Sequence, residues 1–270
     1  MLIYKQYDQA ALNYQFNNRA RVPEFATYLN RHEVTSRQTE KLYSSTKDIQ
    51  YGKGERERLD IYPSPKPDSK ALVFIHGGYW YKFDKSLFQF IAGGFQSYNI
   101  NIVLLNYPLA PTVSIDQIVD SCRKAIKWIQ KNICKEIYVV GHSAGGHLAV
   151  STIVNDDIVK GVCALSGLYN LLPVQLSDVN EFIQINDQTV LHQSPVSLNP
   201  VGRCPVVIAV GADESEEFRE QSEELHKSWK EKKMQIELLM LPGENHYSIV
   251  EEAADKQSAL HEAIVKLMKL

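Results

Sequence analysis

The sequence lacks the features that mark membrane, secreted and nucleic-acid-binding proteins. None of its apolar runs approaches the roughly 20 residues that a membrane helix needs. The opening segment MLIYKQYDQAALNYQ has neither the basic region nor the apolar region of a secretory signal. The formal net charge is only -3, from 29 basic and 32 acidic residues, so the chain has no strong field for polyanions. We therefore expect a cytoplasmic protein that acts on a small molecule, with no nucleic-acid or membrane partner; whether it forms a homodimer stays open.

Cysteine is also scarce. The chain has 4 cysteines, widely spaced and without a C-x-x-C pair: Cys122, Cys134, Cys163 and Cys204. This pattern is typical neither of a disulfide framework nor of a structural zinc site. We expect reduced packing residues, no metal site and no cofactor.

What the sequence does have is a regular alternation of buried strands and amphipathic helices. Strand-like segments include 71–76, 100–107, 136–140, 159–167, 205–213 and 235–243, and helix-like segments between and after them include 115–131 and 216–232. Such alternation predicts an α/β fold, with a mostly parallel sheet covered by helices on both faces. With 270 residues, 44% of them hydrophobic, we expect residues 1–270 to form a single domain.

Two segments depart from this rhythm. Residues 1–45 mix apolar and polar positions and are interpreted as a helical N-terminal arm packed over the rest. Residues 167–204 contain several prolines and no clear long element, and they follow directly on the carboxyl end of a strand. Because ligands of open α/β sheets bind beyond the carboxyl ends of the strands, we expect 167–204 to form a small cap-like insertion over the active face.

The strongest chemical signal is Gly141-His142-Ser143-Ala144-Gly145, which matches G-x-S-x-G between a strand and a helix. The glycines allow a sharp turn that presents Ser143 above the sheet, next to a helix N-terminus. Since a free hydroxyl is a weak nucleophile, Ser143 needs a base and a group that orients that base. Asp213 follows one later strand and His246 the next, in the order that this architecture requires. We predict Ser143, Asp213 and His246 as the catalytic residues, with Asp213 preferred over its neighbour Glu214.

A glycine turn after the strand 71–75 supplies a third component. Acyl transfer passes through an oxyanion that is best stabilised by fixed backbone N–H donors. We predict that the N–H groups of Gly77, Gly78 and Ala144 form the oxyanion hole. Tyr79 and Trp80 follow at once and are expected to wall the acyl site, while Tyr169 of the insertion is expected to contact the leaving group.

The other histidines and the acidic run 216–224 have simpler interpretations. His76 is expected to order the oxyanion loop, and His142 and His147 to pack or hydrogen-bond near the nucleophile. The remaining four are expected at the surface: His32, His192, His226 and His261. The glutamates of 216–224 are interpreted as the solvated face of a helix rather than as metal ligands.

With these motifs placed, the chain resembles the α/β-hydrolase fold and, within it, the kynurenine formamidase (arylformamidase) family. The resemblance extends from about Tyr14 to the C-terminus. The segments that carry it are HGGYW (76–80), LNYPLAP (105–111), GHSAGGHLA (141–149), SGLYNLLPV (166–174), SPV (194–196) and GADESEEFREQS (211–222). It implies a serine hydrolase that removes formate from an aryl formamide such as N-formylkynurenine, with Ser143, Asp213 and His246 as its triad. Two alternatives stay open: a general short-chain carboxylesterase, and a non-catalytic hydrolase fold used for binding.

Overall fold

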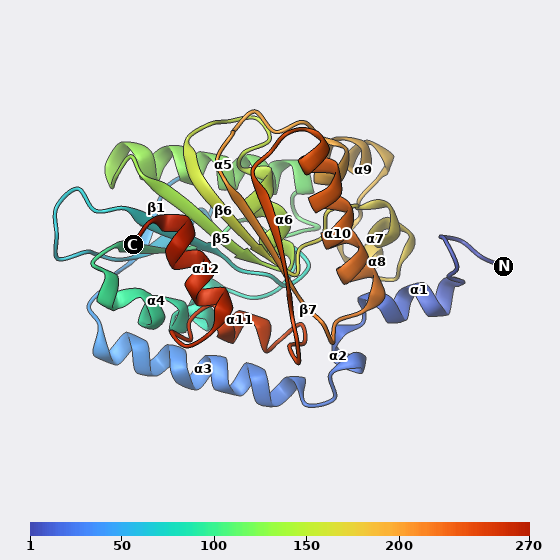
Figure 1. Ribbon diagram of the computed structural model, residues 1–270, viewed down its shortest axis with the longest axis horizontal. Helices are drawn as coiled ribbons and strands as arrows, with labels where there is room; N and C mark the ends of the chain where they lie inside the picture. The colour runs from blue at the N-terminus through green and yellow to red at the C-terminus, as the bar shows by residue number, and fades with distance from the viewer.

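A single eight-stranded sheet organises the molecule, in a computed structural model that describes residues 1–270 (Figure 1). The strand order is β1-β2-β4-β3-β5-β6-β7-β8. The first two strands pair antiparallel, β2 also pairs antiparallel with β4, and all later pairs are parallel. The strands are β1 (Thr46–Gln50), β2 (Arg58–Tyr62), β3 (Ala71–Ile75), β4 (Asn101–Leu105), β5 (Ile137–His142), β6 (Val159–Leu165), β7 (Val206–Gly211) and β8 (Ile236–Leu241). The mostly parallel sheet predicted from the sequence is confirmed.

Helices cover both faces of this sheet, as predicted. Together with three short 3-10 turns, Lys85–Phe88, Gln96–Tyr98 and Pro195–Ser197, they are α1 (Gln9–Phe16), α2 (Asn18–Arg21), α3 (Phe25–Leu42), α4 (Phe90–Phe95), α5 (Ile115–Asn132), α6 (Ala144–Ser151), α7 (Leu172–Leu176), α8 (Asn180–Ile183), α9 (Asp187–Gln193), α10 (Glu216–Glu231), α11 (Ile249–Glu252) and α12 (Ala259–Met268). None of them is long and apolar enough to cross a membrane.

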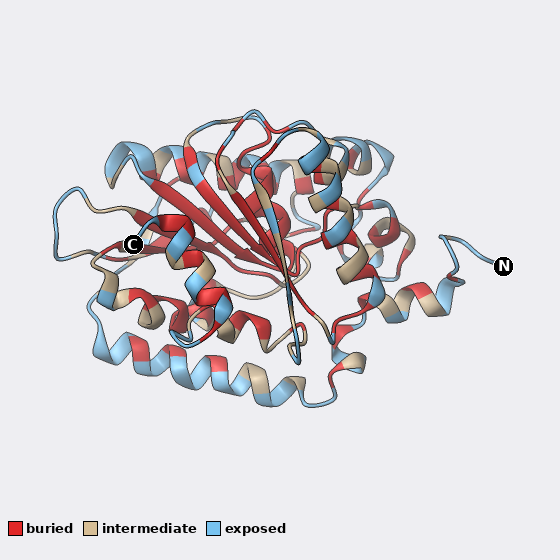
Figure 2. Ribbon diagram, in the orientation of Figure 1, coloured by how far each residue is buried: buried red, intermediate tan, exposed pale blue.

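The central strands are buried on both faces, which explains their continuous apolar sequences (Figure 2). In β3, Val73 and Ile75 point to a core shared with α5, α6 and α10, while Leu72 and Phe74 point to a second core shared with α4, α11 and α12. The alternation of side chains along a strand therefore divides the interior into two apolar layers.

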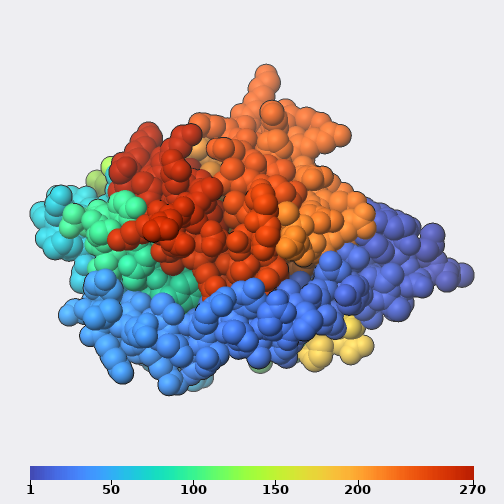
Figure 3. Space-filling model, turned by 60° about the horizontal axis from the view of Figure 1, so that its bottom comes forward, coloured from blue at the N-terminus to red at the C-terminus, as the bar shows by residue number.

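The N-terminal segment forms helices, as expected for residues 1–45. Helix α3 lies along the lower edge of the molecule, beside α4 and the C-terminal region (Figure 3). Its N-terminal half packs on the loop after β8, where Tyr28 stacks on Tyr247 with ring centroids 6.3 Å apart and Asn245 Nδ2 donates to Tyr28 Oη at 3.0 Å. The arm is thus packed against the carboxyl edge of the sheet.

The segment 167–204 holds three short helices, α7, α8 and α9, which lie together at one end of the sheet (Figure 1). Helix α7 contacts α1 of the arm, and α9 contacts α5. The N-terminal arm (1–45) and the insertion (167–204) are therefore neighbours in space.

Candidate active site

Ser143 occupies a strained turn between β5 and α6, with φ 59° and ψ -123°. This backbone region is unfavourable for side chains with a Cβ and persists where the surroundings impose it. Two flanking positions demand glycine: a Cβ on Gly141 would lie 2.0 Å from Gly145 O, and one on Gly145 would lie 2.0 Å from Ile75 O. The two glycines of G-x-S-x-G are therefore required by close backbone packing, which fixes the position of the Ser143 hydroxyl.

His246 lies in the loop after β8, and its ring connects the serine to an acid. Its Nε2 is 3.1 Å from Ser143 Oγ, and its Nδ1 is 2.7 Å from Glu214 Oε2. A carboxylate can only accept, so Nδ1 carries the proton and Nε2 is free to accept the proton of the Ser143 hydroxyl. All three side chains are almost fully buried. The geometry is that of a nucleophile, a base and an orienting acid.

The acid in this arrangement is Glu214, and the prediction of Asp213 was wrong. Strand β7 ends at Gly211, and a tight turn follows in which Glu214 N donates to Gly211 O at 3.2 Å. This turn directs Glu214 inward, whereas Asp213 is exposed and only its backbone N–H is bonded, to Glu244 O at 3.0 Å. Because the chain turns back after Gly211, the acid nearest the strand end in the sequence is not the one that reaches His246.

Further donors fix the orientation of Glu214. Its Oε1 accepts hydrogen bonds from the Ser166 hydroxyl and from Gly211 N, the latter at 2.9 Å. Its other oxygen, Oε2, is thereby left for His246. Both oxygens of Glu214 are therefore hydrogen-bonded, and the fixed carboxylate orients the His246 ring.

The predicted oxyanion donors lie beside the nucleophile. A Cβ on Gly77 would lie 2.9 Å from Ser143 Cβ, so this part of the oxyanion loop passes directly over the serine. Neither Gly77 N nor Gly78 N donates to another backbone group, and Gly78 adopts φ 101°. His76 Nδ1 lies 2.8 Å from Gly77 O, the contact expected of a residue that orders this loop. With Ala144 N at the start of α6, these N–H groups are placed to receive a developing negative charge.

Buried histidines surround this centre. Burial lowers the pKa of His142, His147 and His76, to about 4 for the latter two, so all three are neutral near pH 7. His142 donates from Nε2 to the backbone O of His246 at 2.9 Å, and its ring lies 4.9 Å from that of His246. His147 lies in α6, one turn after Ser143, with Nε2 2.8 Å from Gln193 O. His142 and His147 hydrogen-bond and pack, as expected, and neither forms a hydrogen bond with Ser143 Oγ.

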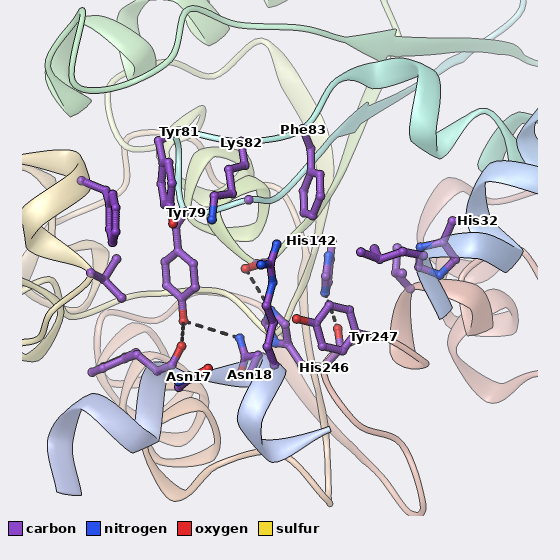
Figure 4. Close-up of a pocket in the computed structure, with 18 of the residues that line it drawn as sticks. Asn17, Asn18, His32, Tyr79, Tyr81, Lys82, Phe83, His142, His246 and Tyr247 are labelled. Carbon is purple, nitrogen blue, oxygen red and sulfur yellow. Dashed lines mark hydrogen bonds between the residues drawn. The ribbon is translucent and has the colours of Figure 1, made fainter. Parts of the chain in front are cut away.

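A pocket of about 260 Å³ opens onto Ser143 (Figure 4). The N-terminal arm, the oxyanion loop, the insertion and the loop of His246 all contribute to its wall. Its twenty lining residues are Phe16, Asn17, Asn18, Arg19, Leu29, His32, Gly78, Tyr79, Tyr81, Lys82, Phe83, Phe88, His142, Ser143, Asp178, Val179, Phe182, His246, Tyr247 and Val250. Half of these residues carry an aromatic ring, if the three histidines are included. The pocket is thus suited to a small ligand with an aromatic part.

Of the three residues expected to bind substrate, only Tyr79 lines this pocket. Its ring crosses the pocket to the arm, where Tyr79 Oη donates to Phe16 O at 2.7 Å (Figure 4). Trp80 and Tyr169 are fully buried in the core and do not reach the pocket, so both predictions were wrong. Trp80 instead donates from Nε1 to His147 Nδ1 at 3.3 Å. In the oxyanion turn, successive side chains point in different directions, which the sequence does not reveal.

The arm contributes pocket residues that sequence reasoning missed. Phe16, Asn18 and His32 all belong to it, and His32, expected at the surface, is only 3% exposed. His261, also expected at the surface, is 1% exposed on the buried face of α12, where its ring lies 4.4 Å from that of Phe95. Helix α3 is rich in polar residues, so its sequence does not show which side packs against the loop after β8.

Comparisons with known proteins identify the fold and the family. Residues 72–182 match a family model described as an alpha/beta hydrolase fold. The chain is 30% identical to a kynurenine formamidase of Salmo salar over 238 residues, which is 82% of this chain and 81% of that protein. It is 30% identical to a kynurenine formamidase of Danio rerio over 249 residues, 85% of each chain.

Solved structures give the same fold. A candidate thioesterase from Silicibacter sp. TM1040 superposes with a TM-score of 0.86 at 26% identity, covering 96% of this chain and 99% of that one. An esterase from Pyrobaculum calidifontis superposes with a TM-score of 0.70 at 18% identity, covering 93% of this chain and 94% of that one, and shows the fold alone. The length and identity of the match to the formamidases are decisive: this hydrolase belongs to the kynurenine formamidase family of the α/β-hydrolase fold.

Proposed function

We propose that the protein hydrolyses an aryl formamide such as N-formylkynurenine, releasing formate and the aryl amine, through an acyl-enzyme on Ser143. The observation that carries the proposal is the contact chain Ser143 Oγ, His246 and Glu214, with distances of 3.1 and 2.7 Å, at the base of an aromatic pocket. The kinship to kynurenine formamidases supports the formamide as substrate.

The first half of the reaction forms the acyl-enzyme. His246 Nε2 takes the Ser143 proton as Oγ attacks the formyl carbon, and Glu214 stabilises the imidazolium that results. The N–H groups of Gly77, Gly78 and Ala144 donate to the oxyanion. When the C–N bond breaks, His246 passes the proton to the departing amine nitrogen.

The second half returns the enzyme to its starting state. Water attacks the formyl ester of Ser143 and gives its proton to His246 Nε2. Collapse of the second tetrahedral intermediate releases formate, and the proton returns to Ser143 Oγ. The transfers between Ser143 and His246 use two atoms that already lie 3.1 Å apart.

A short-chain carboxylesterase is the second candidate, because a serine, histidine and acid arranged in this way can also attack an ester carbonyl. The fold is shared with the Pyrobaculum calidifontis esterase. The two are separated by kcat/KM for N-formylkynurenine, its N-acetyl analogue and a series of p-nitrophenyl esters. The proposal expects the formamide to be preferred over the acetamide, within the roughly 10- to 200-fold that one methyl group can supply in a closely fitting site. Faster hydrolysis of butyryl or longer esters than of any formamide would instead support the esterase.

A further inference from the structure

Lys82 stands out among the pocket residues because its ammonium group has no acidic partner. Most half-buried or buried lysines of the chain pair with carboxylates, as Lys47 does with Asp60 at 3.4 Å and Lys85 with Asp60 at 3.0 Å. Lys82 makes no ion pair and no side-chain hydrogen bond, although it is only partly exposed. Three N–H donors are therefore available inside a pocket that otherwise offers mainly aromatic surface.

Aromatic rings hold the Lys82 ammonium in place. Nζ lies 4.4 Å from the centre of the Tyr81 ring and 5.9 Å from that of Phe182, which belongs to the insertion. The two rings are parallel to within 5°, with centroids 5.1 Å apart. Figure 4 shows the Lys82 side chain extending into the pocket beside the rings of Tyr79 and Tyr81. Cation–π contacts of this kind favour the charge without using up its N–H donors.

The backbone of Lys82 is tied to the oxyanion loop. Lys82 N donates to Gly78 O at 3.0 Å, and Tyr81 N donates to the same oxygen at 3.1 Å. A Cβ on Gly78 would lie 2.5 Å from Lys82 O, which shows how closely the turn is packed. The ammonium group is therefore positioned by the same turn that positions the oxyanion donors.

The other charged residues of the pocket do not neutralise Lys82. Arg19, on the arm, adds a second cation, which lies over the Phe25 ring at 5.2 Å and is exposed. Asp178 is the one acidic residue that lines the pocket, and it forms no ion pair with Lys82 or Arg19. The cavity around Lys82 thus has an excess of positive charge.

The geometry points to Lys82 as the residue that binds a carboxylate group on the leaving-group part of the substrate. This inference rests on the proposed function, because it places the aryl amine in the pocket and the formyl group at Ser143. Lys82 makes no hydrogen bond or ion pair with Ser143, His246 or Glu214, and we assign it to substrate specificity rather than to the chemical step. A substrate with an aryl ring and a carboxylate matches both the aromatic wall and the unpaired ammonium.

The test uses a pair of substrates that differ only in the charged group: 4-(2-formamidophenyl)-4-oxobutanoate and its primary carboxamide. The wild-type enzyme is expected to favour the carboxylate by about tenfold or more in kcat/KM. In Lys82→Met, kcat/KM for the carboxylate falls about tenfold or more, mostly through KM, and that for the carboxamide stays within about twofold. Lys82→Arg keeps most of the preference because it keeps the charge.

A matched control is Lys131→Met, since Lys131 is exposed, unpaired and located at the end of α5, before the amino end of β5. It changes the net charge by the same amount and is expected to leave both substrates unaffected. Equal losses on both substrates in Lys82→Met, or no loss on either, would overturn the assignment. So would an equal loss in Lys131→Met.

Binding of the two amine products measures the same interaction without turnover. Isothermal titration calorimetry should show tighter binding of the carboxylate product than of its carboxamide by wild type, and no such preference in Lys82→Met. If neither formamide is hydrolysed, the proposed function fails, and this binding comparison alone supports or overturns the role of Lys82.

Discussion

Replacing Glu214 by Gln should nearly abolish activity, and the structure gives the reason. Glu214 Oε1 accepts from both the Ser166 hydroxyl and Gly211 N, so the carbonyl oxygen of a glutamine is held at that position. The amide NH2 must then occupy the site of Oε2, 2.7 Å from His246 Nδ1 in the native protein. A donor there forces Nδ1 to accept and moves the ring proton to Nε2.

An Nε2 that carries a proton cannot accept the one from Ser143 Oγ, 3.1 Å away. The expected loss in kcat is about 10⁴-fold, the value known for a triad with the wrong histidine tautomer. The assay is release of formate and aryl amine from N-formylkynurenine, with urea unfolding to show that the variant folds. Glu214→Asp should also lose activity, because a side chain shorter by one methylene cannot reach the ring.

Asp213→Asn is the matched control, one residue earlier and equal in charge change. Its side chain is exposed and bonds to no catalytic group, so kcat should stay within about twofold of the wild-type value. A loss of several orders of magnitude in Asp213→Asn, with Glu214→Gln active, would refute the assignment of the acid.

Three further predictions concern stability and the pocket. Burial lowers the pKa of His76 and His147 from 6.5 to about 4, so the unfolded chain binds more protons than the folded chain between these two pH values. The urea midpoint should therefore stay constant above about pH 6.5 and fall from there toward pH 4, less steeply in His147→Gln than in the wild type. A wild-type midpoint that does not change over this range would contradict this. Trp80→Ala removes a fully buried indole and its hydrogen bond to His147, so it should lower the free energy of unfolding by about 3–5 kcal/mol. Faster hydrolysis of substrates with longer acyl groups, in a variant of unchanged stability, would contradict the core position of Trp80. Tyr79→Phe loses the 2.7 Å hydrogen bond to Phe16 O and should raise KM about fivefold with little change in kcat, as measured by steady-state kinetics; an unchanged KM would show that this link to the arm does not shape the pocket.

The sequence predicted the fold class and most of the catalytic geometry because these depend on local patterns. The strand-to-helix turn at Ser143 demands glycine on both sides, and the alternation of apolar strands with helices determines where the loops of Ser143 and His246 meet. The glycine turn directly after the strand 71–75 likewise marked the loop that passes over Ser143.

The errors arose where side-chain direction depends on tertiary packing. Asp213 and Glu214 are adjacent acids, and only the turn closed by Glu214 N on Gly211 O decides which one points inward. Trp80 turns into the core while its neighbours Tyr79 and Tyr81 line the pocket. The arm is a long-range contribution: Phe16 and His32 reach the pocket through packing between segments that are more than a hundred residues apart in the chain.

The most direct test of the account compares wild type with Ser143→Ala for the release of formate and aryl amine from N-formylkynurenine. Ser143 stands on a turn at the base of the pocket, so the variant is expected to fold, and its urea midpoint can be measured beside the wild type. The account predicts equal amounts of both products from the wild type and a fall of order 10⁶ in the variant. Formate release at the wild-type rate by Ser143→Ala, free of wild-type contamination, would contradict it.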